Sequence, residues 1–385
     1  MSGDRIKESS VRVKSKLRLN VCLATAGFVK ILQEGDKMYN TLKLNNFRRF
    51  KDFSIELKPI SLIAGKNNTG KTSILESIFL LHDYSNSDVF LKLLGFRGIY
   101  MANVFPQTIW EPLFHGMDSA KALIIKMDEN FSIQLEKNDR YSLPNDMPDD
   151  FKNLIGVSPM NYALSCIIKK EDKTIKADYI IGNKVFLVGH KNNGQPFTTS
   201  FAQYMGPNVP LNDNIVAEWF GKVELMGKKQ KLIEGLKILD ENITDITTIV
   251  GNGFPQLYIT NKQNRRMPIH IMGDGIRKIM NVALTILANP FSILLLDEIE
   301  NGLHYSLHAK FWELIASLAT QEKCQVIATT HSYECINGAL EGVKNVELQD
   351  NFAYIRLDIE DENVVAKTFT SDMLEFALTS DWEVR

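Results

Sequence analysis

Gly65-Lys66-Asn67-Asn68-Thr69-Gly70-Lys71-Thr72 fits the pattern G-x-x-x-x-G-K-[ST] of a phosphate-binding P-loop. An apolar run over residues 59–64 precedes this stretch and is typical of a buried parallel strand. Apolar residues at helical spacing follow it over residues 73–81. A strand, a glycine-containing turn and the start of a helix together point backbone N–H groups and the helix dipole at an anion. The pattern therefore predicts a nucleotide site.

The residue types within the stretch have distinct predicted roles. In a P-loop the lysine reaches the β- and γ-phosphates and the hydroxyl binds Mg²⁺, which assigns these roles to Lys71 and Thr72. The predicted ligands are therefore a nucleotide and Mg²⁺. Further contacts to the nucleotide are expected from Gly65, Asn67, Asn68, Thr69, Gly70 and Ser73.

Two later apolar runs also end in polar side chains. Residues 292–296 lead to Asp297 and Glu298, which is the form of a Walker B strand. Such a strand brings its aspartate to the metal, and the following glutamate polarises the attacking water. Residues 324–330 lead to His331. Because ligands of open α/β sheets bind beyond the carboxyl ends of the strands, we expect one site. Its catalytic residues would be Lys71, Glu298 and His331, and its metal-binding residues Thr72 and Asp297.

Composition limits the class of protein. The chain has 385 residues, of which 44% are hydrophobic and 23% charged, as in globular proteins. A formal net charge of −2 gives no overall attraction to nucleic acid, so DNA binding would need a local basic patch. The four cysteines form no C-x-x-C pair and are typical of reduced cytosolic residues. No apolar run reaches the roughly 20 residues of a membrane span, so we expect a cytoplasmic protein.

The chain divides into an extension and one large α/β domain. Residues 1–37 carry a basic stretch, and Met38 directly precedes the first strand pattern. The extension is either a translated leader or tag or a disordered arm, and its deletion should leave stability and activity unchanged. The ATPase domain is expected over 38–385, formed by 38–82 and 243–385 around an inserted β and helical region, 83–242.

Inside this domain we predict a mixed central sheet with an antiparallel β subdomain. Residues 192–212 are rich in Asn, Gly, Pro and Thr and predict a loop. Residues 213–239 carry a helical pattern with several lysines, which form either a solvated face or a phosphate contact. Antiparallel β-structure over 346–368 and a helix over 371–378 should end the fold. Short β runs, whose spacing favours hairpins, cover 122–127, 131–135, 163–168, 177–181, 184–188, 245–250, 257–260 and 268–271.

Several stretches together resemble a known family. They are Asn46-Phe47-Arg48-Arg49-Phe50, the P-loop with Asn67 at its third position, the run 297–304, and Thr330-His331-Ser332. In these the chain resembles the ABC-type ATPase heads of the SMC, RecF and OLD group. With the stretch 272–277 and the final Trp382-Glu383-Val384-Arg385, it looks most like the bacterial stand-alone ATPases that are named AAA-type but are ABC-like in fold.

The resemblance implies a site completed by a second subunit. Heads of this group hold ATP between two copies, and each site receives the signature loop of the other. That loop corresponds to Gly273, Asp274 and Gly275, where the usual serine is replaced by an anionic residue that would repel a phosphate. Backbone N–H groups at the helix start, together with Arg277, are expected to bind instead, with Asp274 as a possible N-cap. Gln107 is the candidate Q-loop residue.

Other chemistry is less well supported by the residues. Glu300, His304 and His308 share an i, i+4, i+8 spacing, which suits either metal ligands on one helix face or surface roles. OLD proteins carry a C-terminal TOPRIM nuclease domain, and too few residues follow His331 for one. We therefore expect no nuclease domain in this chain.

Three functions are open at this point. The first is an ATP-hydrolysing switch that dimerises head to head on ATP and controls a separately encoded effector, a nuclease or toxin, as such ATPases do in phage defence. Its trigger would be DNA or a phage protein, and its assembly a homodimer or a higher even oligomer. The second is a RecF- or SMC-like ATPase that binds DNA during repair. The third is a scaffold in which ATP is only structural, against which the intact Glu298 argues.

Overall fold

The strand that leads into the P-loop lies inside a mixed sheet. The computed structural model describes residues 38–100, 109–139, 163–181, 185–189, 199–209, 211–238, 240–251, 253–380 and 382–384. The predicted extension, residues 1–37, and the candidate Gln107 lie outside the described residues. The sheet order is β16-β15-β3-β14-β13-β9. These strands span Asn363–Phe369, Phe352–Glu360, Ile60–Gly65, Gln325–Thr330, Ile293–Leu296 and Ala202–Met205, respectively.

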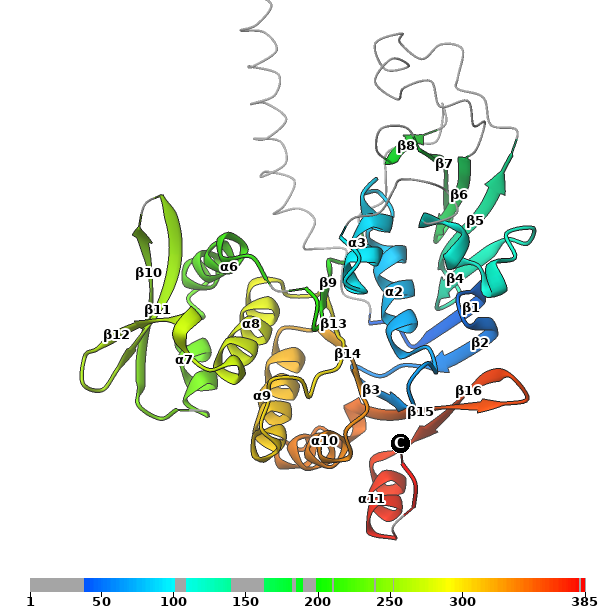
Figure 1. The fold of residues 1–385 in the computed structure, drawn as a ribbon. Helices are drawn as coiled ribbons and strands as arrows, with labels where there is room; N and C mark the ends of the chain where they lie inside the picture. Colours follow the sequence, from blue (N-terminus) through cyan, green and yellow to red (C-terminus); the bar gives the residue numbers. More distant parts are fainter. Residues whose placement is uncertain are drawn as a thin grey trace, which may run out of the picture. The chain divides into compact units, whose positions relative to one another are not determined.

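All strands of this sheet except the edge strand β16 run parallel, which confirms the parallel strand predicted over residues 59–64. β15, from the region predicted to be antiparallel, pairs in parallel with β3 and antiparallel with β16. β3, β13 and β14 are buried along their whole length, since helices cover both faces (Figure 1). Ile60 and Leu62 pack into the core shared with α8 (Asp274–Ala288), α9 (His308–Gln321) and α10 (Tyr333–Asn345). Ile63 faces the opposite core, which it shares with α2 (Lys71–His82).

A second sheet is antiparallel throughout and confirms the predicted hairpins. Its order is β2-β1-β4-β5-β6-β7-β8. α2 contacts β3, β9, β13 and β14 of the first sheet and β4 of the second, so the P-loop helix lies between them (Figure 1). α3 (Val89–Phe96) packs beside α2. The strands span Thr41–Phe47 (β1), Phe50–Glu56 (β2), Leu123–Met127 (β4), Phe131–Asn138 (β5), Ala163–Lys170 (β6), Lys173–Ile181 (β7) and Val185–Gly189 (β8).

A third sheet has three strands in the order β10-β11-β12 and lies on the side of α8 that faces away from the first sheet (Figure 1). The strands span Ile243–Gly251 (β10), Phe254–Asn261 (β11) and Arg266–Pro268 (β12). The predicted strand over 268–271 is a 3₁₀ turn at Ile269–Ile271. A continuous helix over 213–239 is also wrong, because α6 (Asp213–Leu225) and α7 (Lys229–Lys237) are separate helices. The chain turns at Gly227, whose φ of 69° is in the left-handed region that glycine adopts without strain.

The predicted loop over 192–212 is wrong at β9. Residues Ala202–Met205 pair with β13 in parallel register, so that Tyr204 lies opposite Leu295. A four-residue strand carries too short a pattern to be recognised, and its pairing with β13 defines it. The helix and hairpin predicted near the end of the chain are confirmed as β15, β16 and α11 (Ser371–Thr379).

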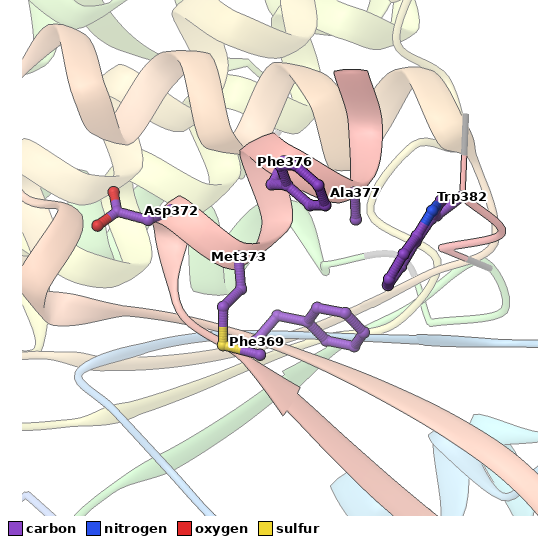
Figure 2. A pocket seen from close by; sticks show the side chains of 6 residues that line it. All are labelled: Phe369, Asp372, Met373, Phe376, Ala377 and Trp382. Atoms are coloured by element: carbon purple, nitrogen blue, oxygen red, sulfur yellow. The ribbon is translucent and has the colours of Figure 1, made fainter. Parts of the chain in front are cut away.

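An apolar hollow of about 310 Å³ lies between β16, α11 and the segment after it (Figure 2). Its lining residues are Phe369, Asp372, Met373, Phe376, Ala377 and Trp382, and the carboxylate of Asp372 points away from the hollow (Figure 2). None of the residues predicted to bind nucleotide belongs to it. Within the described part of the chain, no helix is both long and apolar enough to cross a membrane.

Candidate nucleotide site

The P-loop turns directly from β3 into α2. Gly70 caps the helix with φ 101°, and a Cβ atom there would lie 2.6 Å from Cζ of Phe50. Both the backbone conformation and the close ring therefore require glycine. The hydroxyl of Thr69 donates a hydrogen bond of 2.9 Å to the carbonyl of Lys66, while Asn67 and Asn68 are exposed. The tip of the loop is therefore exposed to solvent, whereas the end that joins α2 is packed against the fold.

Lys71 reaches back across the loop. Its Nζ donates hydrogen bonds of 2.7 Å to the carbonyl of Gly65 and 3.0 Å to that of Lys66. Burial lowers the pKa of Lys71, and the carboxylates of Asp297, Glu300 and Glu298 oppose that effect. The ammonium group therefore lies at the mouth of the loop and within the field of the Walker B carboxylates.

The carboxylate of Asp297, a residue that is 8% exposed, accepts hydrogen bonds from three hydroxyl groups, each on a different helix or strand. Thr72 at the start of α2 and Tyr204 on β9 each donate a hydrogen bond of 2.8 Å to its Oδ2. Thr329 on β14 donates to Oδ1 at 2.5 Å. Burial, and then the charge of Asp297, raise the pKa of Tyr204 well above its ordinary value, so that its hydroxyl stays a donor. The aspartate is therefore fixed in orientation.

Glu298 begins the turn after β13 in a strained backbone conformation. Its φ is 48°, which costs a non-glycine residue on the order of 1–3 kcal/mol. The Glu298 N–H donates to Oγ1 of Thr329 at 2.9 Å, and its Oε2 accepts from Nδ2 of Asn301 at 2.6 Å. These bonds hold the carboxylate at the same sheet edge as Lys71 and Asp297.

The side chain of Lys278 on α8 stabilises the turn after β13 by hydrogen bonds to its backbone carbonyls. Its Nζ donates to the carbonyls of Ile299 at 2.7 Å and Asn301 at 2.6 Å, with a longer bond of 3.4 Å to that of Glu298. Burial lowers the pKa of Lys278 to about 8. Because α8 begins at the candidate signature loop, this side chain ties that loop to the Walker B turn.

His331 and Glu300 form a pair at the end of β14. Nδ1 of His331 lies 2.8 Å from Oε1 of Glu300, which also accepts from the His331 backbone N–H at 2.9 Å. The His331 side chain is 51% exposed, so it can reach a ligand above the sheet edge. Oε2 of Glu300 is buried and has no hydrogen-bond partner among the described residues.

The candidate signature loop lies against the turn that follows Walker B. Asp274 is the first residue of α8 and its N-cap is Gly273, so the expected N-cap role of Asp274 is wrong. Arg277 pairs with the Asp274 carboxylate, which offsets the charge that would repel a phosphate. Both side chains are exposed, and the Cβ of Asp274 is 3.5 Å from an ideal Cβ at Gly302.

The charged stretch ahead of the P-loop contacts α2. Arg48 pairs with the fully buried Glu76 at 2.7 Å, and Arg97 at the end of α3 pairs with the same carboxylate at 2.7 Å. Arg97 also donates to the hydroxyl of Ser73 at 3.2 Å. These cations anchor the first turns of α2 and so the P-loop itself.

The oxygen atoms of Thr72 and Asp297 suit Mg²⁺, which prefers hard oxygen ligands and completes its shell with water and phosphate. An all-protein cage is not needed for this ion. Consistently, no group of three or more His, Cys, Asp or Glu side chains in the described ranges is arranged to hold a metal. Glu300, His304 and His308 therefore do not form the metal site that their spacing allowed.

A phosphate-binding loop, a Walker B strand and a polar sheet edge together define a P-loop ATPase. The family model described as AAA ATPase domain matches residues 38–203 and 211–336. The chain belongs to this family and is an ATPase.

Curated relatives agree with this assignment. An ATP/GTP phosphatase of Helicobacter pylori is 22% identical over 369 residues, which cover 88% of this chain and 97% of that protein. An OLD nuclease of Thermus scotoductus is 23% identical over 341 residues, covering 77% of this chain and 59% of the nuclease. These matches confirm the resemblance to the OLD group.

Among solved structures, an SMC head bound to the C-terminal winged-helix domain of ScpA has a TM-score of 0.47 and 12% identity, covering 87% of this chain and 98% of that chain. The SMC head domain from Thermotoga maritima has a TM-score of 0.41 and 10% identity, covering 86% of this chain and 99% of that chain.

The structure brings together the predicted Lys71, Thr72, Asp297 and Glu298, with His331 joined to them through Glu300. The sequence did not predict four further residues of this site, Tyr204, Thr329, Asn301 and Lys278. The T-T-H stretch that ends at His331 contains Thr329 and was a usable signal. Tyr204 had none, because its strand was not recognised.

Proposed function

We propose that this ATPase is a molecular switch that closes head to head on ATP and Mg²⁺ and controls a separately encoded effector in phage defence. In this account Lys71 and the P-loop residues hold the phosphates, and Thr72 and Asp297 hold Mg²⁺. Glu298 orients the attacking water, and His331 senses the γ-phosphate with support from Glu300. The effector would be a nuclease or toxin, and the trigger DNA or a phage protein.

The observation that carries the catalytic part is the convergence on Asp297. Thr72 from the P-loop and Thr329 from the strand before His331 both bind this carboxylate, so the three strand ends are physically joined. Glu298 follows directly and supplies a second carboxylate at this edge, which a site that only bound nucleotide would not need.

The dimer proposal rests on the exposed loop 273–277. Asp274 and Arg277 have side chains that are 71% and 46% exposed, at the N-terminus of a helix whose free N–H groups suit an anion. The loop packs on the turn at Gly302, so both present one surface to a second copy. A homodimer, or a higher even oligomer built from it, would complete two sites at once.

Two regions of the protein that nucleotide binding does not require support the proposal of effector control. The antiparallel sheet extends from α2, and the α6, α7 and β10–β12 region extends from α8 (Figure 1). The first therefore contacts the helix that begins at the P-loop, and the second contacts the helix that begins at loop 273–277. Closure of two heads would move these regions with α2 and α8 and change what they present to an effector.

The alternative, a DNA clamp used in repair, would use the lysines of α6 and α7. Four of the lysines in and between these helices are already paired with acidic side chains. Lys222 contacts Glu218, Lys229 contacts Asp245, and Lys228 and Lys231 both contact Glu322. The pairing favours the solvated face over a phosphate contact, and we favour the switch.

Sedimentation tests the switch most simply. Glu298→Gln protein with Mg²⁺-ATP should sediment as a dimer or a multiple of it, and with ADP as a smaller species. The Lys71→Ala, Glu298→Gln double variant is the matched control and should not respond to ATP. Monomers of Glu298→Gln at saturating Mg²⁺-ATP would contradict head-to-head closure.

The effector part needs its own test. Purified protein should leave plasmid and phage DNA intact with ATP and either Mg²⁺ or Mn²⁺. Pull-downs from the native host should recover a protein encoded by a neighbouring gene, in an amount that changes in Glu298→Gln. DNA cleavage by the pure chain that persists in Lys71→Ala would overturn the proposal of a separate effector.

A further inference from the structure

Tyr204 comes from the region between α2 and α6, yet its hydroxyl lies on the Walker B carboxylate. Oδ2 of Asp297 accepts hydrogen bonds of 2.8 Å from Tyr204 and from Thr72. Tyr204 is 1% exposed and stands on β9, the strand paired with the one that leads to Asp297. Groups that hydrogen-bond a metal-binding carboxylate set its orientation and thereby tune metal affinity.

The ring of Tyr204 is fixed by its neighbours. It stacks on Phe96 of α3, with ring centroids 3.7 Å apart and planes inclined by 9°. The following residue, Arg97, binds the Glu76 carboxylate through Nε at 2.7 Å and Nη2 at 2.8 Å. On the other side, a Cβ atom at Gly206 would lie 2.7 Å from the Tyr204 hydroxyl. The position of the hydroxyl is therefore set by α3 and by the turn after β9.

We propose that Tyr204 is a positioning residue through which α3 and β9 orient Asp297 for Mg²⁺. The inference rests on the proposed nucleotide site and deepens it. It gives the region between α2 and α6 a direct route to the site, because a shift of Phe96 or of the turn at Gly206 moves the hydroxyl that holds Asp297. A change at the metal would be transmitted outward along the same contacts.

The test measures metal-dependent nucleotide binding, which is independent of turnover. In Glu298→Gln protein, retention of a fluorescent ATP analogue is titrated with MgCl₂, with and without Tyr204→Phe. This substitution keeps the ring on Phe96 and removes the hydroxyl. The Mg²⁺ concentration at half-saturation should rise by about tenfold or more, as for other groups that orient metal ligands. Analogue binding at saturating Mg²⁺ should be retained.

Tyr179→Phe is the matched control, since Tyr179 on β7 of the antiparallel sheet is also fully buried, and its hydroxyl donates to the carbonyl of Tyr84, which follows α2. It should leave the Mg²⁺ requirement unchanged. Gly206→Ala provides a second variant that keeps the hydroxyl but displaces it, and it should shift the Mg²⁺ requirement in the same direction. Half-saturation within about twofold of the parent in both Tyr204→Phe and Gly206→Ala would overturn the inference.

The same titrations test the proposed nucleotide site and the role of Tyr204 separately. If the Glu298→Gln parent does not retain the analogue with Mg²⁺, the proposed nucleotide site is wrong. If the parent binds and the titrations of Tyr204→Phe and Gly206→Ala are both unchanged, the site stands and only the role of Tyr204 is wrong.

Discussion

The hydroxyl of Thr72 donates a 2.8 Å hydrogen bond to Oδ2 of Asp297, although the two residues are 225 positions apart in the chain. One belongs to the P-loop helix and the other follows β13, and β14 separates their strands in the sheet. The contact means that the two residues proposed to hold Mg²⁺ are aligned by the fold itself. A preorganised site of this kind does not have to rearrange its protein ligands when nucleotide enters.

Replacing Lys71 with alanine should abolish ATP binding. The substitution removes the ammonium that spans the loop carbonyls and leaves Asp297, Glu298 and Glu300 without that cation beside them. Equilibrium binding of a fluorescent ATP analogue measures the effect. Lys92→Ala, which removes a surface lysine paired with Asp83, is the control and should bind normally. Binding by Lys71→Ala at the unsubstituted affinity would remove Lys71 from the site.

Replacing Glu298 with glutamine should preserve ATP binding and slow hydrolysis. Loss of a group that orients or activates the water is expected to lower kcat by on the order of 10²–10⁴-fold. Phosphate release under saturating ATP measures kcat, and Glu360→Gln in the β15–β16 hairpin is the control. Hydrolysis by Glu298→Gln at the normal rate would show that another group acts on the water.

The sequence predicted the strand ends because each combines a continuous apolar run with a polar residue where the run stops. Asp297 and His331 could therefore be assigned to one edge before any geometry was known. β9 could not be predicted, since its four residues become a strand only by pairing with β13. Tyr204 was missed for the same reason, and the break at Gly227 was hidden by an apolar pattern that continues on both sides of it.

Gly70→Ala should destabilise the protein and disrupt the P-loop. Gly70 has φ 101°, and an added Cβ would lie 2.6 Å from the buried ring of Phe50. We expect a loss of more than about 1 kcal/mol in the free energy of unfolding, measured by urea denaturation. Gly221→Ala in α6 is the control, because a Cβ there meets nothing within 4 Å. It should stabilise by up to about 1 kcal/mol, and equal effects of the two substitutions would refute the steric argument.

His82 should make stability depend on pH below neutrality. The ring lies between Tyr39 and Phe131, and burial lowers its pKa from 6.5 to about 4. The unfolded chain then binds more protons than the folded one between these values, so stability falls as pH falls from 6.5 to 4. The lost free energy should be roughly 3 kcal/mol. His82→Phe removes the titrating group, and its unfolding free energy should fall less over this range. Parallel pH curves would contradict the prediction.

Complementation between two inactive variants tests the central claim, that each nucleotide site is shared by two copies of the chain. Lys71→Ala removes a copy's own P-loop function, whereas Arg277→Glu places a second carboxylate in the loop offered to its partner. Each variant alone should hydrolyse ATP poorly. A mixed dimer contains one site with both Lys71 and Arg277, so an equal mixture should recover about a quarter of normal activity. No recovery at any mixing ratio, or normal activity of Arg277→Glu alone, would contradict the shared site.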